Sequence, residues 1–78
     1  MTDTLPIPPH LLPGSALRHY KGGLYTVVGS CIIEATLEVG ILYTPCQGDQ
    51  RTLWMRPMSA FDDLIELPRG SIKRFKPA

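Results

Sequence analysis

The chain has 78 residues, a formal net charge of +1, two cysteines and two histidines. This length suits one domain and is too short for two. The small core of such a domain leaves little room for a deep enzyme pocket. The near-neutral charge excludes a global attraction to nucleic acid or membranes, and the apolar runs are far shorter than the about 18 residues of a membrane-spanning helix.

Residues 1–14 are rich in proline and hold half of the eight prolines in the chain. Proline fixes φ and disfavours helix at the residue before it, so we predict an extended or flexible tail. Its aliphatic side chains either pack along the edge of the domain or remain free. The start of the chain lacks a basic stretch followed by an apolar block, so we expect no signal peptide and a cytoplasmic protein. The domain itself then comprises residues 15–78.

From Ala16 onward the pattern is typical of β-strands. Lys21-Gly22-Gly23 predicts a hairpin turn, because glycine supplies the positive φ that tight turns require. Residues 24–33 are rich in β-branched side chains, and Gly29 among them indicates a bulge or a close backbone approach. Residues 36–44 alternate apolar and polar side chains, as a half-buried strand does. The buried face of that strand would hold Leu37, Val39, Ile41 and Tyr43.

The second half of the chain continues the β pattern with one interruption. Residues 52–56 predict a short strand, which Pro57 ends before a single helical turn at residues 58–61. Residues 64–67 and 72–75 resume the extended pattern on either side of a Pro/Gly turn. We therefore predict an all-β domain, a small SH3-like five-stranded bent barrel with one short helical turn before the last strands. A plain antiparallel sheet covered by a helical turn is the alternative.

The run Arg18-His19-Tyr20-Lys21-Gly22-Gly23, with Tyr25, occurs together with Leu53-Trp54-Met55-Arg56-Pro57 and Phe61. These segments resemble a short bacterial and phage family, the domain of unknown function number sixteen fifty-three. The resemblance extends over nearly all of the foldable chain. It implies a compact β-rich domain and supplies neither an established activity nor catalytic residues. The chain departs from the family pattern around Ile32-Ile33-Glu34-Ala35, where members often carry a polar cluster.

Four residues are candidates for a ligand site. Trp54 and Arg56 lie two positions apart in a strand, so their side chains share a face, which we expect to be the less buried one. The indole offers a stacking surface and the guanidinium a bidentate hydrogen-bond fork. His19 and Lys21 share a face in an extended chain and are suited to phosphate beside the glycine turn.

Each candidate also has a structural explanation. Trp54 would cap the core, and His19 and Lys21 would be polar flanks of a hairpin turn. Arg56 would form an ion pair, with Glu38, Asp62 or Asp63 as its partner.

The other aromatic and charged side chains are interpreted as structural. Tyr25 and Tyr43 share parity with aliphatic residues, so we place both mainly in the core. The basic run Lys73-Arg74-Phe75-Lys76 is interpreted as a solvated end with a weak local attraction to phosphate. Asp62-Asp63 is interpreted as an exposed polar pair that ends the helical turn.

Metal, cofactor and catalytic chemistry are not expected. Cys31 and Cys46 are predicted to be reduced thiols, because the chain shows no export signal. The cysteines do not form a Cys-x-x-Cys motif, and His10 and His19 lack metal-ligand spacing, so we expect no metal and no cofactor. No nucleophile lies at a recognisable spacing from a histidine and an acid, and we expect no enzymatic activity.

The residues are therefore best explained by a noncatalytic binding module whose site is formed by His19, Lys21, Trp54 and Arg56. A nucleotide or single-stranded nucleic acid is the favoured ligand, since stacking and phosphate contacts match these side chains. The alternative is a protein-interaction module that docks a peptide, or that forms a homodimer through residues 6–13. Raised salt should weaken binding driven by phosphate contacts and leave apolar docking unchanged.

Overall fold

A computed structural model describes residues 7–48, 51–61 and 63–78. Within these ranges the chain is all-β, with two 3₁₀ turns and no α-helix. None of the helical segments described is long and apolar enough to cross a membrane. The elements in chain order are η1 (Pro9–Leu11), β1 (Ala16–His19), β2 (Leu24–Ile32), β3 (Val39–Pro45), β4 (Trp54–Pro57), η2 (Met58–Ala60), β5 (Leu64–Leu67), β6 (Gly70–Lys73) and β7 (Phe75–Pro77).

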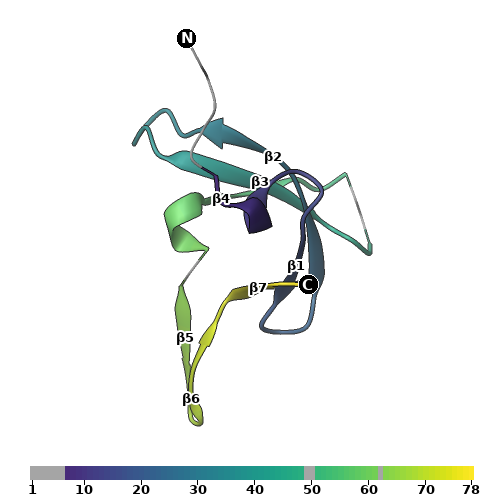
Figure 1. The fold of residues 1–78 in the computed structure, drawn as a ribbon, viewed down its shortest axis with the longest axis vertical. Coiled ribbons are helices and arrows are strands. Elements are labelled where there is room, and N and C mark those ends of the chain that lie inside the picture. The colour runs from purple at the N-terminus through teal and green to yellow at the C-terminus, as the bar shows by residue number, and fades with distance from the viewer. Residues whose placement is uncertain (1–6, 49–50, 62) are drawn as a thin grey trace.

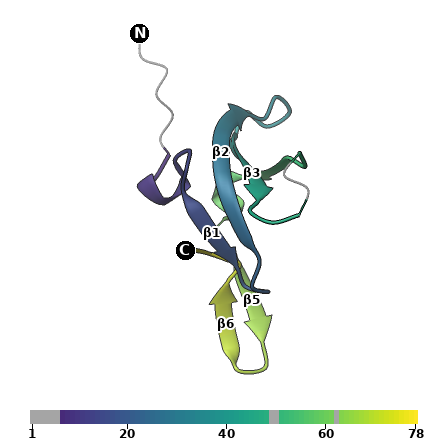
Figure 2. The same cartoon turned by 90° about the vertical axis from the view of Figure 1, so that its right-hand side faces the viewer.

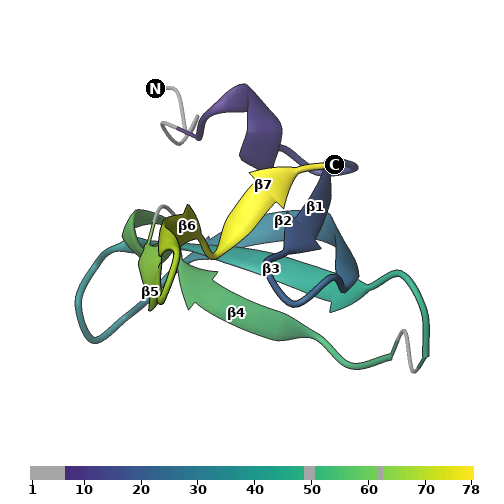
Figure 3. The same ribbon diagram turned by 90° about the horizontal axis from the view of Figure 1, so that it is seen from below.

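The main sheet has five antiparallel strands in the order β4-β3-β2-β1-β7, while β5 and β6 form a separate hairpin (Figure 1). The sheet is strongly bent, and the hairpin extends away from it (Figure 2). The predicted all-β bent architecture, with η2 before the last strands, is confirmed. The barrel is not closed, because β4 and β7 remain the two edges of the sheet (Figure 3).

The prediction of one continuous strand at residues 72–75 is wrong. The chain bends at Arg74, so β6 pairs with β5 and only β7 joins β1. Two backbone bonds hold the bend: Arg74 N donates to Asp63 O at 2.9 Å, and Tyr20 N donates to Arg74 O at 2.8 Å. These long-range bonds have no counterpart in the local apolar pattern, which explains why the sequence did not reveal the break.

The hairpin between β1 and β2 forms where the glycine pair predicted it. Gly22 adopts a φ of 101°, and its amide donates to the carbonyl of His19 at 2.8 Å. The bulge suggested by Gly29 is also present, because the register with β3 shifts between Val27 and Gly29. This bulge bends β2 and contributes to the curvature of the sheet.

The connection between β2 and β3 is longer than predicted. Leu37, expected on the buried face of a strand, lies in this connection with a φ of 63° and a 76% exposed side chain. Its amide donates to Ile33 O at 2.6 Å, and Ile33 N donates to Glu38 O at 2.8 Å. A left-handed leucine is uncommon, so a turn here could not be predicted from residue type.

The core lies on the concave face of the sheet and under η1 and η2. The proline-rich segment, whose packing the sequence left open, contributes Leu11 to this core, and Ile7 packs against it. Residues 1–6 of the predicted tail lie outside the described residues. Cys31 and Cys46 are not bonded to each other. The buried core side chains are Leu11, Leu17, Val27, Ile41, Tyr43, Phe61 and Phe75.

Candidate functional site

The open seam between the two edge strands holds a small pocket, here called the seam pocket. Its volume is about 170 Å³. Every strand of the main sheet contributes to its wall or rim, because the bend brings β4 and the start of β7 toward each other over the concave face (Figure 3). The lining residues are His19, Tyr25, Tyr43, Trp54, Arg56, Arg74 and Phe75.

The floor of the seam pocket is aromatic. Tyr43 is 8% exposed and packs edge-on against Tyr25, with ring centroids 5.4 Å apart. Phe75 closes the cluster at 5.9 Å from Tyr25 and 5.6 Å from Tyr43. The predicted core role of the two tyrosines is thus correct for Tyr43, whereas Tyr25 is only half-buried. Both tyrosines also present ring surface to the pocket.

β4 supplies the side chains at one rim. Trp54 pairs with Tyr43 and Arg56 pairs with Ile41, so both point to the concave face. Their shared parity was predicted correctly. Both faces of β4 remain accessible, since Trp54 is 52% exposed on the concave face and Met55 is 46% exposed on the opposite one. The pairing with β3 decides the orientation, and the sequence of β4 alone does not contain it.

Trp54 remains 52% exposed although it faces the concave side. It lies on an edge strand, so the sheet covers only one side of the indole. It therefore does not cap the core, and part of its surface is accessible to a ligand.

Arg56 and Arg74 flank a single carboxylate. Arg56 donates from Nε to Ala60 O at 3.1 Å and from an Nη atom to Asp63 Oδ2 at 2.9 Å. Arg74 Nε lies 3.8 Å from the same oxygen and, among the described residues, has no hydrogen-bond partner although the atom is buried. The structural explanation for Arg56, an ion pair with Asp63, is therefore present. Two guanidinium groups share one acid, which leaves one positive charge in excess at this rim.

His19 lines the seam pocket and contributes a neutral imidazole that can donate a hydrogen bond. Its Nδ1 accepts a hydrogen bond from the backbone N–H of Lys21 at 3.2 Å, so the neutral ring carries its proton on Nε2. Burial lowers the pKa of His19 below its ordinary value, and the nearby charges of Arg74, Lys21 and Arg56 lower it further. Burial is the largest cause of this lowered pKa, and the smaller contribution of the three cations reflects positive charge near the pocket, which an anion would offset.

The structure brings together His19, Trp54 and Arg56 of the predicted site and leaves Lys21 outside the lining. The Lys21 ammonium lies on the exposed hairpin, 5.8 Å from the centroid of the Tyr20 ring. Its effect on the pocket is electrostatic, through the pKa of His19.

The sequence analysis missed Arg74, which was assigned to a solvated basic end, and named Asp63 only as one of three possible ion-pair partners of Arg56. Both residues meet Arg56 between the two edges of the sheet. The only sequence signal was the position of Arg74 directly before the core aromatic Phe75, which places it next to buried structure.

The described part of the chain contains no group of three or more His, Cys, Asp or Glu side chains suited to hold a metal ion. The chemistry available at the seam pocket is stacking, hydrogen-bond donation and attraction of negative charge.

A family model described as a protein of unknown function, DUF1653, matches residues 15–77. The chain belongs to the DUF1653 family. A crystal structure of a DUF1653 protein from Bordetella bronchiseptica is similar, with a TM-score of 0.69 and 27% sequence identity over 85% of each chain. The comparison with curated proteins found no match. The resemblance noted in the sequence is therefore confirmed, and the DUF1653 description itself assigns no activity.

Proposed function

We propose that this DUF1653 domain is a noncatalytic binding module that recognises a nucleotide or single-stranded nucleic acid at the seam pocket. The observation that carries the proposal is the juxtaposition of a half-exposed indole with two guanidinium groups that share one carboxylate. Bases stack on aromatic side chains regardless of sequence, and arginine matches the geometry of phosphate oxygens.

The size of the pocket limits what enters it. A volume of about 170 Å³ is well below the about 300 Å³ at which pockets for drug-sized ligands begin. One base or one phosphate would occupy the pocket, and the rest of a strand would remain outside. The net charge of +1 offers no general attraction, so binding would depend on this local charge.

A noncatalytic role agrees with the hydrogen bonding of His19. Its Nδ1 is engaged with the backbone, and its lowered pKa favours a neutral donor. Within the described residues no carboxylate is hydrogen-bonded to the ring, as an oriented general base would require. A cytoplasmic location is part of the proposal and agrees with Cys31 and Cys46 not forming a disulfide.

The test uses Trp54, the single tryptophan of the chain, as a fluorescent reporter inside the site. Mononucleotides and short single-stranded DNA and RNA are titrated at low and raised salt. We expect saturable changes in Trp54 emission that fade as salt rises, because phosphate contacts release counterions. An emission that does not respond to any of these ligands at low salt would contradict the proposal.

A pair of arginine variants separates the pocket from general charge. Arg74→Gln removes a guanidinium from the pocket, and Arg69→Gln removes the same charge from the exposed turn between β5 and β6. We expect Arg74→Gln to weaken binding and to reduce the salt slope by about 0.7 for a lost phosphate contact. Equal losses in the two variants would place binding elsewhere.

A second candidate, a peptide-docking module, rests on exposed apolar side chains in β4 and directly before it. Leu53 and Met55 are 57% and 46% exposed beside Trp54, and β4 is an edge of the sheet. An extended peptide could pair with such an edge. Binding of a proline-rich peptide that does not weaken with salt would favour this candidate. A homodimer in which residues 6–13 dock on a second copy would require Leu11 to leave the core of its own domain.

A further inference from the structure

A larger pocket lies beside the seam pocket, at the hairpin between β1 and β2 and the end of β3. We call it the turn pocket, and its volume is about 450 Å³, within the range of about 300–1,000 Å³ that is usual for small-molecule sites. Tyr25 lines both pockets, so the two are adjacent. The lining of the turn pocket also includes Arg18, Gly22, Gly23 and Pro45.

Arg18 supplies the positive charge of the turn pocket. It is exposed, and one of its Nη atoms donates a hydrogen bond to the carbonyl of Gly22 at 3.3 Å, which holds the guanidinium beside the turn. A guanidinium has five N–H donors, and this bond engages one of them. No acidic side chain lines the turn pocket among the described residues. The guanidinium is therefore suited to a phosphate group.

The glycine pair keeps the turn pocket open. A Cβ at Gly22 would meet no atom within 4 Å, so the space next to this residue is open. A Cβ at Gly23 would lie 3.4 Å from Cε1 of Tyr25 and would cover this edge of the ring. Because glycine lacks a Cβ, a ligand can reach both the backbone of the turn and the ring of Tyr25.

We propose that the ligand of this domain is a single strand of at least two nucleotides, which continues from the seam pocket into the turn pocket, rather than a free mononucleotide. This strand path rests on the proposed function, because it extends the site that holds the first nucleotide. The neighbouring base would lie against Tyr25 and Pro45, and its phosphate would meet Arg18. Two adjacent pockets that each combine an aromatic ring with a guanidinium match the repeat of bases and phosphates along a strand.

The first test compares thymidine 5′-monophosphate with the 5′-phosphorylated thymidine dinucleotide, using Trp54 emission at low salt. We expect the dinucleotide to bind at least about fivefold more tightly, because its second base gains a stacking surface. Equal affinities for the two ligands would overturn the strand path and leave the seam pocket as a mononucleotide site. An emission that responds to neither ligand nor to longer strands would contradict the proposed function as well.

Variants of Arg18 test the turn pocket itself. Arg18→Gln should weaken the dinucleotide about twofold to fivefold, as expected for one exposed phosphate contact, and should not affect the monophosphate. Loss of folding would weaken both ligands, so this split reports the contact. Arg18→Lys should retain part of the effect, because it keeps the charge.

Arg69→Gln is the matched control, since it makes the same change of charge on the turn between β5 and β6. It should leave the affinity for both ligands unchanged. Equal effects of Arg18→Gln and Arg69→Gln on the dinucleotide would overturn the strand path, as would an Arg18→Gln variant that weakens both ligands equally.

Discussion

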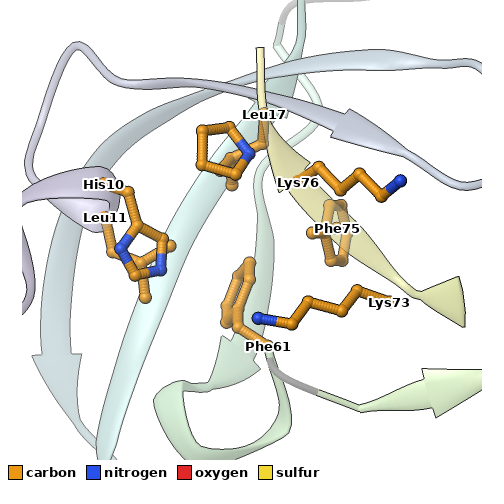
Figure 4. A pocket seen from close by; sticks show the side chains of 8 residues that line it. His10, Leu11, Leu17, Phe61, Lys73, Phe75 and Lys76 are labelled. Atoms are coloured by element: carbon orange, nitrogen blue, oxygen red, sulfur yellow. The ribbon is translucent and has the colours of Figure 1, made fainter.

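Another pocket, of about 250 Å³, lies beside η1, and we call it the η1 pocket; it is lined by His10, Leu11, Leu17, Phe61, Lys73, Phe75, Lys76 and Pro77 (Figure 4). The seam pocket and the η1 pocket share the ring of Phe75 and differ in almost everything else. The seam pocket combines aromatic rings with two guanidinium groups and one carboxylate. The η1 pocket combines aliphatic side chains and phenylalanine with a lysine rim. The difference shows that the core of a small domain is accessible to solvent at more than one place. At each place, the residues around the accessible core side chains determine which kind of ligand could bind.

The largest effect is expected where the two pockets meet. Phe75→Ala should destabilise the domain by about 3–5 kcal/mol, because it opens a cavity in the core. Urea unfolding measures the loss. Leu12→Ala, at a 45% exposed position, is the control and should change stability by less than about 0.5 kcal/mol. Similar losses in both variants would mean that Phe75 is not a core residue.

Trp54→Ala should remove the stacking surface of the seam pocket. Loss of stacking costs about 1–3 kcal/mol per base, so nucleic-acid affinity should fall at least fivefold. Leu53→Ala, at a residue that does not line the pocket, is the control and should retain affinity. Calorimetric titration with single-stranded DNA tests this difference. Unchanged affinity in Trp54→Ala would remove the indole from the site.

Asp63→Asn should increase the positive charge at the seam pocket. Without its carboxylate the two arginines carry two uncompensated charges, and single-stranded DNA should bind about twofold to fivefold more tightly at low salt. Glu66→Gln makes the same change of charge on the β5–β6 hairpin and is the matched control. Weaker binding by Asp63→Asn would instead assign Asp63 the role of positioning Arg56.

The pH dependence of the seam pocket follows from His19. Its pKa is lowered from 6.5 by burial and then by Arg74, Lys21 and Arg56. Below pH 6.5 the unfolded chain therefore binds more protons than the folded one, and stability falls as pH falls toward the lowered pKa. A bound phosphodiester favours the charged ring, so affinity for single-stranded DNA should rise over the same window.

Titrations of His19→Gln and His10→Gln between pH 7.5 and 5 check this linkage. The first substitution should remove the increase in affinity and the second should retain it. An increase that survives in His19→Gln would assign the titration to another group.

The smallest effect is expected far from both pockets. Leu37 has a φ of 63°, which costs a leucine about 1–2 kcal/mol, whereas glycine adopts it freely. After the entropy cost of glycine, Leu37→Gly should stabilise the domain by up to about 1 kcal/mol. Thermal unfolding measures the gain, and neither pocket should respond. A loss of stability would indicate that the 76% exposed side chain makes contacts that offset the strain.

The local signals of the sequence were reliable where a single residue type dictates the backbone. The glycine pair at residues 22 and 23 placed the first hairpin, and Gly29 marked the bulge in β2. The parity of Trp54 and Arg56 followed from the two-residue period of a strand. The turn at Leu37 and the bend at Arg74 were missed, because backbone hydrogen bonds rather than residue type stabilise them.

The candidate site was only partly accessible to such reasoning. His19, Trp54 and Arg56 could be selected because they combine aromatic and cationic chemistry at strand spacing. Asp63 was only one of three possible partners of Arg56, and Arg74 was not selected, because folding is what brings these residues of separate segments together in one ion-pair network. Lys21 was selected on parity and remains outside the pocket, because the hairpin turn directs its side chain to solvent.

By itself the sequence determined that this chain is a small, all-β, near-neutral domain of a recognisable family. The sequence also determined that the aromatic and cationic side chains of the candidate site lie in two short segments. Alternation, turn residues and composition act locally, and they carry that information in neighbouring positions. Only the tertiary structure decided which face of β4 points to the concave side, that the sheet remains open, and that two arginines share one acid at the seam. Those outcomes depend on strand register and on contacts across the sheet, which no local pattern encodes.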